Sequence, residues 1–207
     1  MKTRSKKATV KRQKKATKNM VAFVLSLITC GEDCDYDLPA VSFADCDPET
    51  NLSQISKIRI AKKTAADFSD WTQASEWATR ISATSTDPDA IRELSVIGDK
   101  PKPETTKKGI SGGREIVAAK KHTINVEIDE SNAINHEFVR GTKCIKTVKF
   151  WYGTIGGLLF GGNTGITAQL ELDMTLGRND GDIVVYQGTL IWSKIDLEER
   201  CTDPVAA

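Results

Sequence analysis

The chain has 207 residues, of which 39% are hydrophobic and 28% charged, values typical of a globular protein with one core of ordinary size. Its net charge is only +1, but residues 1–19 contain nine basic residues and no acidic one. Residues 20–207 are left with 20 basic and 28 acidic residues, a net charge of −8. No run of about 18 apolar residues occurs, so we expect no transmembrane helix and no membrane partner.

Residues 1–19 are predicted to form a basic disordered arm, because like charges repel and large apolar side chains are scarce. Two partners remain open: nucleic acid, bound through its phosphates, or an acidic neighbouring subunit. The arm has no aromatic residue to stack on bases, so any DNA contact would be non-specific. The candidate contact residues are Lys6, Lys7, Lys11, Arg12, Lys14 and Lys15.

Residues 20–54 are predicted to be an extended lead-in. The apolar run 21–28 follows a basic segment and superficially resembles a secretory signal, with Cys30 as the lipid-bearing residue of an exported lipoprotein. The basic segment is too long and the apolar run too short for an ordinary signal, which argues against export. Export is therefore kept only as the alternative. Met20 is an alternative start, in which case residues 1–19 are an extension.

The five cysteines show no metal-site spacing. Cys30 and Cys34 are close together, but no second pair and only two histidines accompany them. We expect reduced thiols and no metal site. A disulfide between Cys34 and either Cys30 or Cys46 is the alternative in an oxidising compartment.

The predicted main domain, residues 55–207, opens with a strand over 55–60, in which Arg59 points outward. A helix is predicted over 70–82, because apolar residues recur at spacings of three and four. Asp70 is the expected N-cap, with Gln73 three residues later in a capping-box relation.

A strand is predicted over 91–97, followed by a long polar excursion over 99–113 that contains two prolines. We expect this excursion to be a mobile loop or a hairpin arm. Loops of this length in a compact domain are usually functional or disordered, so contact with another subunit is the predicted use. The candidate interface residues in it are Lys100, Lys102, Lys107 and Lys108.

Further strands are predicted over 122–128 and 147–152, with a short helix over 132–139 between them. The glycine-rich segment 153–165 predicts a flexible hairpin whose tip exposes apolar groups. These groups, Leu158, Leu159 and Phe160, are additional candidates for a subunit interface.

The last part of the chain alternates apolar and polar residues over 166–174 and again over 184–192, as two half-buried strands require. The turn 177–182 between them contains Asn, Asp and Gly, which tolerate positive φ. About seven strands and one packed helix predict a mainly β (α+β) fold, an antiparallel β-sandwich or partly closed barrel. Its four tryptophans are expected to anchor one cluster between helix and sheet.

No catalytic constellation occurs in the chain. His136-Glu137 has no second histidine at the metalloprotease spacing, and the glycines of 156–162 lack the Lys-Ser/Thr of a phosphate loop. The acidic turn at 180–182 lacks a calcium-loop frame, and His122 on an alternating strand predicts a packed or interfacial histidine. We therefore expect no enzyme, no cofactor and no metal. A hydrolase that uses His122 or His136 as its base is the alternative.

From about residue 51 the order of elements resembles tail-tube-like virion proteins of tailed bacteriophages and, more loosely, structural proteins of phages that infect Bacteroidetes. The matching parts are the strand 55–60 with the helix 70–82, the segment 91–98, the Pro101/Pro103 excursion, the segment 121–130, and the strands containing 150–152 and 188–192.

The resemblance implies a β-sandwich flanked by a helix, with a long loop or hairpin that reaches an adjacent subunit. Such subunits form homo-oligomeric rings, commonly sixfold, and DNA passes through the lumen. The expected protein is then a non-enzymatic virion protein that self-assembles into a ring or tube in the tail or head–tail junction, beside other virion proteins. The basic arm departs from the usual pattern. The alternatives are a capsid-associated or decoration protein and an exported, lipid-anchored β-sandwich that binds a ligand.

Overall fold

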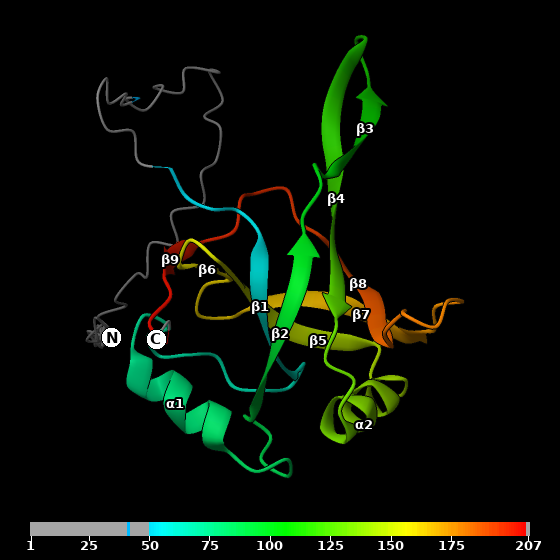
Figure 1. Cartoon of the computed structure of the whole chain (residues 1–207). Coiled ribbons are helices and arrows are strands. Elements are labelled where there is room, and N and C mark those ends of the chain that lie inside the picture. Colours follow the sequence, from blue (N-terminus) through cyan, green and yellow to red (C-terminus); the bar gives the residue numbers. More distant parts are fainter. Residues whose placement is uncertain (1–40, 42–49, 206–207) are drawn as a thin grey trace, which may run out of the picture. The chain divides into compact units, whose positions relative to one another are not determined.

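Six antiparallel strands close into a barrel in the computed structural model of the chain, which describes residues 41 and 50–205 (Figure 1). Around the barrel the order is β1, β2, β4, β8, β7 and β5, and β5 pairs back with β1. The prediction of a mainly β fold with an antiparallel barrel is confirmed. The bounds are β1 Ile55–Lys62, β2 Ile91–Asp99, β4 Arg114–Ile128, β5 Thr147–Thr154, β7 Ile166–Thr175 and β8 Val185–Ser193.

Three shorter strands and two helices are attached to the barrel. Strand β3 (Glu104–Ile110) pairs only with the outer half of β4, and together they form a hairpin that projects from the barrel (Figure 1). Strands β6 (Leu158–Phe160) and β9 (Arg200–Thr202) extend the sheet from β5. The helices are α1 (Ala74–Ser82) and α2 (Ala133–Thr142).

The barrel interior is filled by apolar side chains that alternate with outward-facing polar ones. Ile124, Phe150 and Leu190 are 0% exposed, and the predicted alternation of the last two long strands is visible in the burial of Leu170 and Tyr186. Each such residue stabilises the fold by about 1.5–3 kcal/mol relative to its exposed state. Among the described residues the barrel interior is therefore a packed apolar core.

A second apolar cluster lies outside the barrel, between α1 and the outer face of β1 and β5. Trp77 and Trp151 are both 0% exposed and meet edge to face, with ring centroids 5.3 Å apart. Phe68 and Trp71 complete its aromatic part, whereas Trp192 lies inside the barrel. The prediction of a single tryptophan cluster is therefore wrong, because the sheet separates two apolar layers.

The glycine-rich segment closes over Trp151, and of its apolar side chains Ile155 is 51% exposed. The Trp151 indole Nε1 donates to the Gly162 carbonyl oxygen at 2.8 Å. Gly161 and Gly165 have φ of 142° and 68°, and a Cβ at either position would clash with the Trp151 ring. Leu159 is 0% exposed, so the expectation that this tip exposes its apolar groups is wrong for that residue.

Helix α1 begins four residues later than predicted, and Asp70 is not its N-cap. The residue at that position is Gln73, which makes no side-chain capping hydrogen bond. The Asp70 carboxylate instead accepts from the Thr72 backbone nitrogen at 3.0 Å and from Gln73 Nε2 at 3.1 Å. Asp70 therefore organises the turn before the helix, a local choice that competes with capping.

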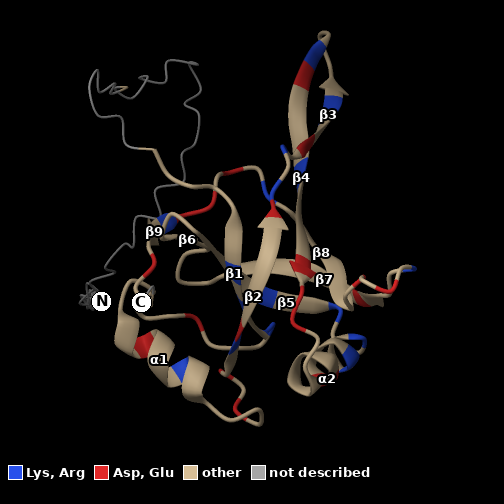
Figure 2. Cartoon of the chain, viewed as in Figure 1, with Lys and Arg blue, Asp and Glu red and all other residues tan. Residues whose placement is uncertain are grey.

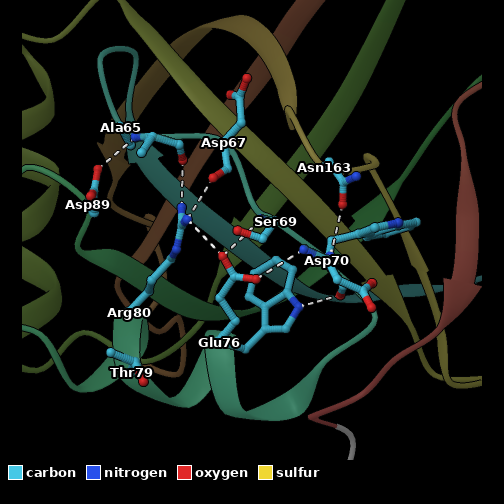
Figure 3. Close-up of polar contacts among 12 residues, drawn as sticks. Ala65, Asp67, Ser69, Asp70, Glu76, Thr79, Arg80, Asp89 and Asn163 are labelled. Carbon is cyan, nitrogen blue, oxygen red and sulfur yellow. Dashed lines mark hydrogen bonds and ion pairs between the residues drawn. The ribbon is translucent and has the colours of Figure 1, made fainter. Parts of the chain in front are cut away.

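Side chains from the first and last turns of α1 hold the loop that precedes the helix (Figure 3). Glu76 accepts from the backbone nitrogens of Ser69 and Asp70 at 3.1 and 3.2 Å. Arg80 donates to the carbonyl oxygen of Asp67 at 2.9 Å and pairs with Glu76 at 3.1 Å. These contacts fix α1 against the outer apolar cluster.

Arg59 points away from the barrel interior, as predicted, but it is 1% exposed. Its guanidinium pairs with Asp203 at 2.8 Å and with Glu93 at 2.7 Å, and lies 5.0 Å from the centroid of the Trp77 ring. The C-terminal segment that carries Asp203 covers this strand face. Arg59 thereby ties the C-terminal segment to the barrel.

Candidate functional site

The strand β3, which forms a hairpin with the outer half of β4, pairs with no other strand of the described chain. Seven residue pairs join the strands, from Glu104–Lys121 at the root to Ile110–Arg114 beside the turn. Every residue of β3 is exposed. Gly112 and Gly113, with φ of 82° and 71°, make the turn that the sequence indicated only as a polar excursion. The excursion 99–113 is thus a hairpin arm and not a mobile loop.

Apolar and charged side chains share this hairpin. Ile110, Ile116 and Val117 are 37%, 47% and 39% exposed. Charges of both signs flank them (Figure 2), and Lys107 pairs with Glu115 at 3.3 Å. A strand with an unpaired edge and exposed apolar side chains is a surface on which another chain can pair.

The structure divides the predicted interface residues among three places. Lys107 and Lys108 lie on β3 and Lys102 at its root, all exposed. A second group, Lys100, Leu158 and Phe160, lines one cavity near the root. Leu159 belongs to the buried outer cluster, with no exposed surface for a partner. The predicted contact residues of the basic arm, Lys6 to Lys15, lie outside the described residues.

The cavity beside the hairpin root has a volume of about 1420 Å³. Its walls come from the barrel strands and from the segments before β1 and after β8. Three apolar side chains on the wall are exposed: Leu52 at 67%, Ile97 at 51% and Leu197 at 88%. Sequence patterns missed this cavity, because its residues come from segments far apart in the chain.

A buried polar cluster lies between the cavity and the barrel core. Lys100 Nζ donates to Glu198 Oε2 at 2.7 Å and to the Tyr152 hydroxyl at 3.1 Å. The same ammonium group lies 5.4 Å from the centroid of the Trp192 ring, which stacks on His122. Of the two environments predicted for His122, packed or interfacial, the structure has the packed one, since the residue is 3% exposed. No local pattern in the sequence indicated Lys100 and Glu198 as neighbours of this ring, because they are remote from it in the chain.

The charges in this cluster are stabilised by pairing. Burial alone would raise the pKa of Glu198, but the hydrogen bond from Lys100, a backbone hydrogen bond and the positive charge of Lys100 together hold that pKa below its usual value. Burial, with the negative charge of Glu198, raises the pKa of the Tyr152 phenol. The cluster therefore holds a carboxylate, an ammonium group and a neutral phenol at neutral pH.

Three buried polar atoms of this region have no hydrogen-bond partner: Nδ1 of His122, Oε1 of Glu198 and Nε1 of Trp192.

Among the described residues, no group of three or more His, Cys, Asp and Glu side chains could hold a metal ion. In the same part of the chain, no helix combines the length and apolar character needed to cross a membrane.

No protein-family model matches the chain, and comparisons with curated proteins and with solved structures also give no match.

Proposed function

We propose that the chain is a non-enzymatic virion structural protein that self-assembles into a ring or tube, in a phage tail or at the head–tail junction. The observation that supports this is the projecting hairpin, whose two outer edges pair with no other strand among the described residues. Unpaired strand edges with exposed apolar residues are templates for association with another chain. The resemblance in element order favours a virion partner.

The hairpin favours contacts between unlike surfaces of neighbouring copies. A projecting arm that docks on a different surface of the next copy makes a heterologous contact, and such contacts generate closed rings or open filaments. The barrel interior is packed, so a DNA-sized lumen would be formed between subunits. A sixfold ring around DNA, in contact with other virion proteins, is the assembly we propose, with arm residues 1–19 available for non-specific DNA contact.

Electron microscopy of the purified full-length protein tests the assembly. We expect rings or tubes whose abundance rises with protein concentration, and sedimentation should show the same species. A strict monomer at high concentration that is also absent from purified particles would contradict the proposal.

A matched pair of hairpin variants tests the role of the arm. Replacing Ile116 and Val117 with threonine keeps β propensity but removes the exposed apolar surface, so assembly should be lost while the melting temperature is retained. The control exchanges the same residues as Ile116→Val and Val117→Ile, which keeps the apolar surface and should still assemble. Equal assembly of both variants would remove the hairpin from the interface.

A ligand-binding barrel is the second candidate function, favoured by the 1420 Å³ cavity with its exposed apolar wall. An apolar ligand with one polar end would fit walls that carry both apolar groups and the Lys100–Glu198 pair. In the exported form of this hypothesis, Cys30 carries a lipid. Mass spectrometry of the intact protein without a lipid on Cys30, together with rings in the microscope, would favour the structural role.

A further inference from the structure

The ring of His122 is fixed at the point where β4 leaves the barrel and continues into the hairpin. Its Nε2 lies 2.9 Å from the Lys194 carbonyl oxygen. A carbonyl oxygen only accepts hydrogen bonds, so Nε2 must carry the hydrogen. In the neutral ring, Nδ1 is then an unprotonated acceptor.

This acceptor faces a second acceptor. Nδ1 of His122 lies 3.8 Å from Oε1 of Glu198, and the two side chains are 4% and 3% exposed. The other oxygen of Glu198 already accepts from Lys100, while Oε1 has no donor. Two buried acceptors this close together, with no donor between them, are each left without a hydrogen bond, which is unfavourable for both groups. A single proton between them satisfies both.

We propose that His122 and Glu198 form a proton-binding site that fastens the root of the hairpin to the segment after β8. A proton taken from solvent by Nδ1 makes the imidazolium, which donates to Oε1 of Glu198 and keeps its bond to Lys194. The His122 ring then makes two attachments to residues 194–198, beside the hydrogen bonds that join Lys120 to Lys194 and Ile195. Loss of the proton restores the two facing acceptors and loosens this attachment.

The charged groups around the ring decide the direction of the effect. Lys100, from the link between β2 and β3, places an ammonium group on Glu198, and Tyr152 of β5 contributes a neutral hydroxyl. On β4 itself, Lys120 donates to the Ile195 carbonyl oxygen and Lys121 pairs with Glu104 at the surface. The imidazolium therefore faces one carboxylate directly, with Lys100 on the far oxygen of that carboxylate.

The attachment is strengthened as pH falls and weakened as pH rises. Imidazole side chains change charge between about pH 5 and 8, a range in which Glu198 stays ionised. The proton adds a charge-assisted hydrogen bond on the acidic side of that range, and the bond is lost on the alkaline side. The proposal concerns the root of the hairpin within one subunit and holds whether or not the hairpin mediates assembly.

Amide hydrogen exchange of the full-length protein at pH 8 and pH 6, corrected for intrinsic exchange rates, tests the site. Peptides that cover 120–124 and 193–198 report on the attachment. We expect protection to rise on the order of tenfold at pH 6, the effect of one hydrogen bond to a charged group. Equal protection at both pH values would overturn the proposal.

Three variants assign the effect. In Glu198→Gln the amide donates to the neutral Nδ1 and its oxygen still accepts from Lys100, so protection should be high at both pH values. In His122→Gln the rise with acid should disappear. His136→Gln is the matched control, because its ring contacts Tyr186 elsewhere, and it should behave as the wild type. If Glu198→Gln fails to fold, a rise that survives in His122→Gln or vanishes in His136→Gln still refutes the assignment.

Discussion

The two halves of strand β4 experience opposite environments. Its inner half lies in the barrel, where Ile124, Val126 and Ile128 are buried and alternate with more exposed polar residues. Its outer half forms the hairpin with β3, and residues 114–118 are exposed on both faces. The same strand thus belongs first to a packed barrel and then to an arm whose side chains have no partner in the described part of the chain.

The contrast between the buried and exposed halves of β4 predicts that different residues determine the stability of the subunit and its association with other chains. Barrel residues stabilise the subunit through burial, so their substitution should be felt in unfolding. Hairpin residues bury little within the subunit, so their substitution should leave unfolding almost unchanged and act on association. Matched substitutions in the two regions can break or sharpen this comparison.

Breaking the buried Arg59–Asp203 ion pair on the outside of the barrel should give the largest loss in the free energy of unfolding. Arg59→Met leaves Asp203, whose side chain is 5% exposed, without its partner, and we expect a loss of about 3–5 kcal/mol in the free energy of unfolding. Urea unfolding at fixed protein concentration measures it. The double variant Arg59→Met/Asp203→Asn removes the uncompensated charge and should recover part of the loss. A loss below about 1 kcal/mol for the single variant, as typical of surface pairs, would contradict the covered state of this face.

Replacing a glycine that lies against Trp151 with alanine should give the second-largest loss in the free energy of unfolding. Gly161→Ala forces a side chain into a backbone with φ of 142° and against the Trp151 ring, and we expect a loss of about 1–3 kcal/mol. Gly109→Ala in β3 is the control, because nothing lies within 4 Å of the added Cβ. The midpoint of urea unfolding should fall for the first variant and stay near the wild type for the second. Equal midpoints would mean that the segment over Trp151 is not closed in solution.

The sequence predicted the parts of the fold that depend on local periodicity. Alternation in β7 and β8 and the short helix near Asn132 were predictable, and Asn132 indeed caps α2 by accepting from the Asn135 backbone nitrogen at 2.8 Å. Strand β9 was missed, because three residues are too short for a periodic signal. The start of α1 was misplaced, because Asp70 suits both a cap and a turn.

The candidate site was less predictable than the fold. The length and polarity of 99–113 indicated an exposed arm, but its pairing with β4 depends on residues that follow it. The clustering of His122 with Lys100 and Glu198 results from closure of the barrel and from the path of the segment after β8. Glycine content indicated a flexible tip at 153–165, whereas the fold uses those glycines to pass close to Trp151. Contacts between distant segments have no signature in local spacing.

The exposed ion pair of the hairpin should give the smallest effect and complete the comparison. Lys107 and Glu115 are 3.3 Å apart, but their side chains are 63% and 62% exposed. Solvent screens such a pair, so Lys107→Ala should change the free energy of unfolding by less than about 0.5 kcal/mol. A double-mutant cycle with Glu115→Ala, read by urea unfolding, isolates the coupling between the two side chains. Coupling well above about 1 kcal/mol would show that the hairpin is covered in solution, since only a pair shielded from water interacts that strongly.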